Sequence, residues 1–160
     1  MASTLGTYLE DHLAGSRYAL DLLQDLKEQT ADVNLAQLAA RLQMEIEGDR
    51  EVLQKLAARV GTETTRVKEM AAWVAQKAGR LKLAMAEPFG RFEAIEMLSL
   101  GVLGKLALWN ALKAVRSSNI QLADLEFDEL IQRAVAQHSE LESRRLELAR
   151  LVLTADSNDS

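Results

Sequence analysis

The chain has 160 residues, of which 48% are hydrophobic and 27% charged, and its formal net charge is −5. A chain of this size can bury a substantial core as one domain, and its acidic balance argues against a generic nucleic-acid surface. It contains no cysteine, which excludes disulfide bonds, thiolate metal sites and cysteine nucleophiles.

The residue usage predicts an all-α protein. Leu, Ala, Glu, Arg and Gln dominate the sequence, and all five are strong helix formers. One proline and eight glycines are too few turn residues for a β-sandwich or a β-barrel. Met1–Gly6 has no basic residue, and glycines and a lysine interrupt the apolar stretch Met97–Trp109. We therefore expect a cytoplasmic protein with neither a signal peptide nor a membrane span.

Two long amphipathic helices are expected in the first sixty residues. Leucines recur every three or four residues over Thr4–Glu28, and His12 falls on the same face. The second helix is expected over Asn34–Val60, with the asparagine as its N-cap and Gly61 as its stop. Asp49 falls on the apolar stripe of this second helix.

A shorter helix over about 62–82 and a long helix over Arg91–Arg116 are expected next, separated by Pro88. The long helix is apolar on more sides than one bundle core can absorb, which favours homodimerisation. Gly101 and Gly104 interrupt it, and we expect them to allow the close approach of a neighbouring helix or a kink, with a ligand contact as a less favoured reason.

The last helix is expected to begin with Asp124 as its N-cap and to end near Leu153, with His138 on its apolar face. Residues 1–153 are expected to form a single helical-bundle domain. Residues 154–160 are expected to form a disordered polar tail.

The order of these helices predicts two hairpins joined by a connector. A connector helix of about 16 residues spans roughly 24 Å, which is long enough to return the chain along a bundle. In this order the chain resembles the ferritin-like superfamily of four-helix bundles with one long crossover, over nearly its whole length. The stretches Tyr8–Gly15 and Gly104–Trp109 are similar to stretches in uncharacterised bacterial proteins.

The di-iron members of that superfamily carry a Glu-x-x-His pair on two of their helices. No Glu-x-x-His occurs in this sequence. The resemblance therefore implies the fold, and it implies neither iron binding nor oxidase activity.

The candidate site consists of polar residues on or beside the apolar stripes of four different helices. These residues are His12, Glu45, Asp49, Glu96 and His138. Imidazole and carboxylate groups together suit Fe, Mn or Zn. Alternatively they form a polar network, because buried charges must be paired. In that network His12 would pair with Asp49, and Arg145 would pair with Glu96 or Glu142. A ligand pocket that uses one of these groups as a proton acceptor is a third interpretation.

The leading hypothesis is a non-catalytic, ferritin-like bundle that works by self-association, as a homodimer, or by binding a partner. The alternative is a metal-binding bundle with redox or metal-handling activity at the His/carboxylate site. Nothing in the sequence pairs a nucleophile with a base or forms a phosphate-binding loop, so no catalytic residue is expected.

Overall fold

The computed structural model describes residues 3–62, residue 76 and residues 85–154. Within these ranges the chain forms α-helices and short 3₁₀ turns and no strand, which confirms the prediction of an all-α fold. The long helices are α1 (Thr4–Gln29), α2 (Val33–Val60), α4 (Pro88–Val115) and α5 (Phe127–Val152). The predicted helix over about 62–82, apart from residue 76, and the predicted tail beyond residue 154 lie outside the described residues.

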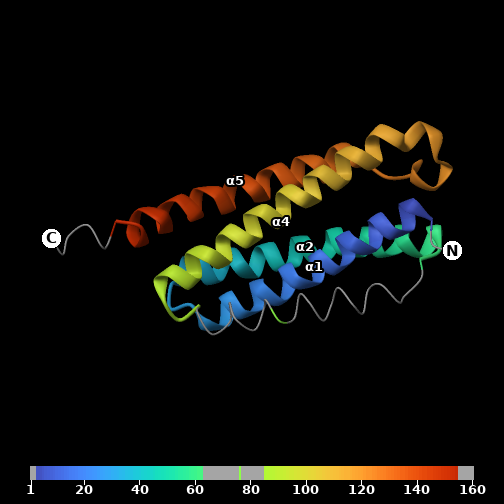
Figure 1. Cartoon of the computed structure of the whole chain (residues 1–160). Coiled ribbons are helices and arrows are strands. Elements are labelled where there is room, and N and C mark those ends of the chain that lie inside the picture. The colour runs from blue at the N-terminus through green and yellow to red at the C-terminus, as the bar shows by residue number, and fades with distance from the viewer. Residues whose placement is uncertain (1–2, 63–75, 77–84, 155–160) are drawn as a thin grey trace.

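The four long helices lie side by side as two antiparallel hairpins (Figure 1). One hairpin is α1 with α2, and the other is α4 with α5. The last turn of α2 and the first turn of α4 lie at opposite ends of the bundle, so α2 and α4 run in the same direction (Figure 1). The two antiparallel hairpins agree with the predicted helix order, whereas the connector predicted to join them lies almost wholly outside the described residues.

Each helix turns an apolar stripe towards a shared core. The core is rich in leucine, as the three- and four-residue spacing predicts, and Trp109 and Phe127 are its largest fully buried side chains. Burying one such side chain stabilises the fold by about 1.5–3 kcal/mol relative to leaving it in water. Helix α4 supplies more buried residues than any other described helix, in agreement with its apolar composition.

The start of α2 differs from the prediction by two residues because a different side chain caps it. Asp32, and not Asn34, is the N-cap, and its Oδ1 accepts the backbone N–H of Leu35 at 3.1 Å. The end of α2 lies where the sequence predicts it. Gly61 adopts a left-handed conformation with φ of 76°, which few other residues tolerate.

The starts of α4 and α5 also differ from the prediction. Helix α4 begins three residues early, at Pro88, because proline has no N–H to leave unsatisfied at a first helical position. Helix α5 begins at Phe127, and Glu126 occupies its N-cap position without a side-chain hydrogen bond. Asp124 is therefore not the cap, and its carboxylate is bound elsewhere.

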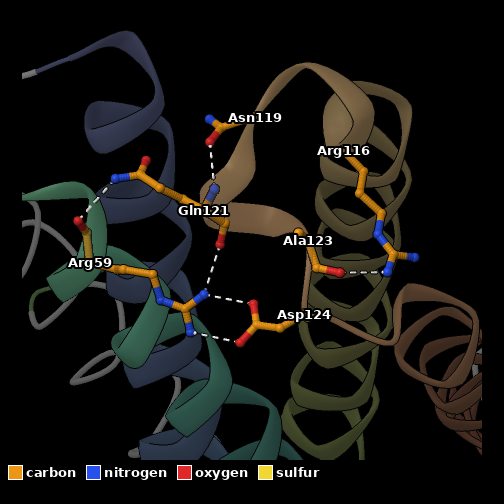
Figure 2. A network of polar contacts seen from close by, with 6 residues as sticks. All are labelled: Arg59, Arg116, Asn119, Gln121, Ala123 and Asp124. Carbon is orange, nitrogen blue, oxygen red and sulfur yellow. Dashed lines mark hydrogen bonds and ion pairs between the residues drawn. The ribbon is translucent and has the colours of Figure 1, made fainter.

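Asp124 instead binds Arg59, at the end of α2 (Figure 2). The two guanidinium nitrogens of Arg59 lie 2.7 and 3.2 Å from the two carboxylate oxygens, and this hydrogen-bonded contact lowers the pKa of Asp124. Arg59 also donates to the carbonyl of Gln121 at 2.8 Å, and the Gln121 side chain donates to the carbonyl of Arg59 at 3.1 Å. These contacts attach the end of α2 to the turn between α4 and α5.

The two glycines of α4 do not have the role that the sequence suggests. A Cβ atom added at Gly101 or at Gly104 would meet no described atom within 4 Å beyond the helix itself. No described helix therefore approaches α4 closely at either position, so the described part of the chain does not show the expected close helix packing there. The space beside these glycines belongs to a pocket.

Candidate functional site

A buried carboxylate, Asp49, lies at the centre of the bundle with 2% of its side chain exposed. The Lys105 Nζ atom of α4 lies 2.6 Å from its Oδ2, and the Arg133 Nε atom of α5 lies 2.9 Å from its Oδ1. One side chain of α2 thus holds a cation from each helix of the other hairpin. Leaving the carboxylate unpaired at this depth would cost several kcal/mol.

Two polar side chains extend this cluster towards the surface between α2 and α5. The Lys105 ammonium also donates to the side-chain oxygen of Gln137, and the Gln137 amide donates to Glu45 at 2.9 Å. Gln137 is buried, whereas His138 beside it is half-buried. The inward position on α5 is therefore Gln137 and not the predicted His138, because adjacent helical residues point about 100° apart.

Burial and ion pairing oppose each other in this cluster. Removal from water lowers the pKa of Lys105, and the neighbouring Asp49 carboxylate only partly opposes that effect. The cluster therefore contributes little net stability, while removing one member leaves the others buried without a partner. Its main effect is to fix the position of α2 against α4 and α5.

His12 does not pair with Asp49, as the sequence had suggested. Its ring packs edge-on against Tyr8, with 4.8 Å between ring centres. Burial lowers the pKa of His12, and the nearby Asp11 carboxylate opposes the shift. Asp49 is paired with cations from the other hairpin, although its Oδ1 accepts no hydrogen bond from the described residues, and His12 lies on the wall of a pocket that both residues line.

A second ion cluster lies around Arg145 on α5. Its guanidinium binds Glu96 of α4 at 3.0 Å and Glu142 at 2.5 Å, and the pKa of Glu142 is lowered by these hydrogen bonds. Ser99 also donates to Glu142, at 3.3 Å. Glu96 precedes Lys105 by nine residues of α4, which corresponds to about 14 Å along the helix. Glu96 and Asp49 therefore belong to separate clusters.

The structure does not bring the candidate metal-binding residues together. Among the described residues, no group of three or more histidine and carboxylate side chains is arranged to hold a metal ion. Glu45, Asp49 and Glu96 each accept a hydrogen bond or an ion pair from a side chain of α4 or α5. Metal binding stays a prediction that rests on residue types alone.

A pocket of about 370 Å³ opens between α1, α2 and α4. Its lining is mostly apolar, with Asp49 and Lys105 at the back. Trp109 and Arg50 belong to its lining, and the Nε1–H of Trp109 and the Nε–H of Arg50 are buried and lack partners among the described residues. Sequence reasoning missed this pocket, although the small residues Gly101 and Gly104 on an otherwise apolar helix were a signal for open space.

Glu10 is a further buried carboxylate that sequence reasoning gave no role. It is 2% exposed, and neither carboxylate oxygen has a hydrogen-bond partner among the described residues. It does not line the pocket. The helical period could have identified it, because Glu10 adjoins the leucine stripe of α1 at Leu9 and Leu13.

The Asp49 cluster gives a direct stability prediction. We expect Asp49→Ala to lower the free energy of unfolding by about 3–5 kcal/mol, because Lys105 is left buried without an anion. The double variant Asp49→Leu, Lys105→Met should recover most of that loss, as measured by urea unfolding. Asp21→Ala, which breaks the exposed Arg17–Asp21 pair, is the matched control and should change little. If Asp49→Ala and Asp21→Ala had the same free energy of unfolding, this account would be contradicted.

His12 predicts a pH dependence. Its pKa in the folded protein lies below the ordinary value of 6.5, so the unfolded chain binds protons more readily. The contribution of neutral His12 to the free energy of unfolding is therefore fully present above pH 6.5, and the free energy of unfolding falls as the pH drops below that value. Carboxylates with lowered pKa values, such as Glu142, lose their contribution to the free energy of unfolding only below about pH 4.5. Thermal unfolding between pH 7 and 5 should show the decline in the wild type.

The matched variants for this pH effect are His12→Gln and His138→Gln. The decline between pH 7 and 5 should be reduced in His12→Gln. It should persist in His138→Gln, because His12 is retained there. A decline of the same size in His12→Gln as in the wild type would show that another group causes it.

Comparisons with known proteins do not extend these findings. No protein-family model, curated protein or solved structure matches this chain.

Proposed function

We propose that this protein is a non-catalytic helical-bundle protein of ferritin-like architecture that works by self-association, with α4 packing against α4 of a second copy. The observation that carries this proposal is an apolar surface along the outer side of α4. The helix order and the parallel course of α2 and α4 support the ferritin-like part of the proposal.

The outer side of α4 is apolar over most of the helix, and Glu93 and Glu96 interrupt it in the first third. Leu100 is 57% exposed and Leu103 is 41% exposed, and Phe89, Met97 and Val115 are exposed to a similar degree. Exposed alanines fill the positions between the larger side chains in the second half of the helix. We call this surface the α4 face, and it comprises Phe89, Met97, Leu100, Leu103, Gly104, Ala107, Ala111, Ala114 and Val115. Met97, Leu100 and Gly104 of this face also line the pocket. An apolar surface of this extent is typical of an interaction site.

The charges beside the α4 face favour an antiparallel pair of helices. Glu93 and Glu96 lie in the first third of α4, and the face beyond them carries no charge. A parallel pair would place these carboxylates against the same carboxylates of the second copy. An antiparallel pair places them against the alanines near the other end, with Gly104 near the crossing point. Such a pair is two-fold symmetric, as closed dimers are.

Membrane insertion of α4 is the competing explanation for its apolar surface. Among the described residues, Pro88–Ser118 is the segment that is long and apolar enough to cross a membrane by length and composition. The core helix of a soluble protein meets the same criteria. Lys105, within this segment, forms an ion pair with Asp49 inside the bundle, which favours α4 as a bundle helix.

The metal-handling alternative has less support than self-association. It would require side chains of separate clusters to release their present partners and converge. The residues concerned are His12, Glu45, Asp49, Glu96 and His138.

Self-association is tested by analytical ultracentrifugation over a wide range of protein concentration. The wild type should form a dimer as the concentration rises. Leu103→Glu combined with Ala107→Glu should remain a monomer, because each copy then carries two carboxylates on the α4 face. Met44→Glu is the matched control, since Met44 is 77% exposed on α2 and lies outside that face.

Three outcomes would overturn the proposal. The first is a wild type that is monomeric throughout. The second is a Leu103→Glu, Ala107→Glu variant that dimerises as the wild type does. The third is a monomer that floats with phospholipid vesicles, which would assign the α4 face to a membrane.

A further inference from the structure

We infer that self-association through the α4 face takes up protons at Glu93, so that the dimer is tighter at pH 5 than at pH 7. This inference rests on the proposed self-association and names the residue that regulates it. It follows from a difference between two glutamates of α4, of which Glu96 has a counter-ion and Glu93 has none among the described residues.

Glu93 lies within the apolar stripe of the α4 face. It follows Phe89 by four residues, and it precedes Met97 by four residues and Leu100 by seven, which is the spacing of one side of a helix. Those three apolar side chains are exposed, whereas the Glu93 side chain is already half-buried in the single chain. A second copy that covers the α4 face along its length therefore covers Glu93 as well.

Glu96, one turn later on α4, is paired within its own chain. The guanidinium of Arg145 on α5 lies 3.0 Å from its carboxylate. Since α4 and α5 are antiparallel, the residue of α5 level with Glu93 lies three positions after Arg145 and is Leu148. Leu148 is apolar and buried, so α5 offers no cation to Glu93 at this level. An unpaired carboxylate costs more to remove from water than a paired one.

The other described cations at this end of the bundle do not bind Glu93. Arg91 donates to backbone carbonyls before α4, Arg144 binds carboxylates of α2 and α5, and Lys27 donates to a side-chain amide of α2. Arg150 is exposed near the end of α5 and forms no ion pair with a described carboxylate. Glu93 therefore brings an uncompensated negative charge to the α4 face.

A second copy does not supply the missing cation in an antiparallel pair. The first third of α4 then lies against the last third of the second α4, where the face consists of alanines and Val115. Two cations lie near that end, Lys113 and Arg116. Lys113 binds Asp128 of α5 at 2.5 Å, and Arg116 donates to the carbonyl of Ala123 in the following turn, as Figure 2 shows for Arg116. Both side chains are thus held away from the α4 face.

Association therefore removes the Glu93 carboxylate from water without bringing it a cation. Removal from water favours the neutral form of a carboxyl group, so the dimer binds a proton at Glu93 more readily than the monomer does. The dissociation constant consequently falls as the pH is lowered. Because a two-fold dimer contains two copies of Glu93, the constant can fall by up to about 100-fold per pH unit.

The test is the dimer dissociation constant of the full chain, measured by analytical ultracentrifugation at pH 7, 6 and 5 in about 0.15 M salt, which screens long-range repulsion. The constant of the wild type should fall about tenfold or more between pH 7 and pH 5. Glu93→Gln should form a dimer about tenfold or more tighter than the wild type at pH 7, because a neutral amide is buried at lower cost than a charge. Its dissociation constant should change little with pH.

Glu96→Gln is the matched control. It removes one negative charge from the same helix, one turn away, so it has the same effect on net charge as Glu93→Gln. Its dimer should keep the pH dependence of the wild type, because Glu93 is retained. Circular dichroism at each pH verifies that the chains are folded, since His12 affects the free energy of unfolding in the same pH range.

Three outcomes would overturn the inference and leave self-association intact. The first is a wild-type dimer with the same dissociation constant at pH 7 and pH 5. The second is an equal gain in Glu93→Gln and Glu96→Gln, which would assign the effect to net charge. The third is a weaker dimer in Glu93→Gln, which would show that the second copy supplies a cation. Absence of a dimer at all three pH values, in the wild type and in Glu93→Gln, would overturn self-association itself.

Discussion

The arrangement of the bundle depends on one buried carboxylate. Asp49 carries a negative charge on α2 into the core, and it is neutralised by Lys105 from α4 and Arg133 from α5. Apolar stripes alone allow helices to slide past one another by a turn at small cost, because leucine packs well against leucine. A buried ion pair prevents such a slide. A shift of one turn would separate the two ions and leave each of them buried without the attraction that offsets its removal from water. The cluster therefore selects one register among several that the apolar residues accept.

That register has consequences on both sides of α4. On its inner side, Lys105 pairs with Asp49, and Trp109 is buried beside the pocket that Asp49 and Lys105 also line. On its outer side, the same rotation of α4 leaves Leu100 and Leu103 in solvent. Helix α4 thus has too many apolar residues for one core, and the surplus forms an outer face that shares Met97, Leu100 and Gly104 with the pocket. Self-association is the use that we propose for this surplus.

Sequence reasoning predicted the helices better than the site. The leucine spacing and Gly61 located both ends of α1 and the end of α2 to within one residue, because those signals act within a few residues of chain. Tertiary contacts overrode the local signals elsewhere: Asp124 has the chemistry of an N-cap, yet it binds Arg59 across the bundle. The Glu96–Arg145 contact was predictable from hairpin geometry, since the short turn between α4 and α5 constrains which residues face each other.

The site was harder to predict because it depends on how each helix is rotated about its own axis. A difference of one residue on α5 exchanges Gln137 for His138 at the core, and a helical wheel drawn from sequence does not resolve that difference. The partner of Asp49 was also missed, because Lys105 reads as a surface residue within an apolar helix. Lysine can bury its aliphatic stem along apolar neighbours and deliver its charge to a distant partner. The open space beside Gly101 emerges only when three helices are placed together.

The most direct measurement is disulfide cross-linking of single-cysteine variants under mild oxidation, since the chain has no cysteine of its own. In an antiparallel pair of α4 helices, Leu103→Cys lies near the two-fold axis and should form a covalent dimer. Val115→Cys alone should not cross-link, whereas a mixture of Phe89→Cys and Val115→Cys should. Self-cross-linking of Val115→Cys would contradict the antiparallel arrangement, and Leu103→Cys that stays monomeric would contradict association through α4.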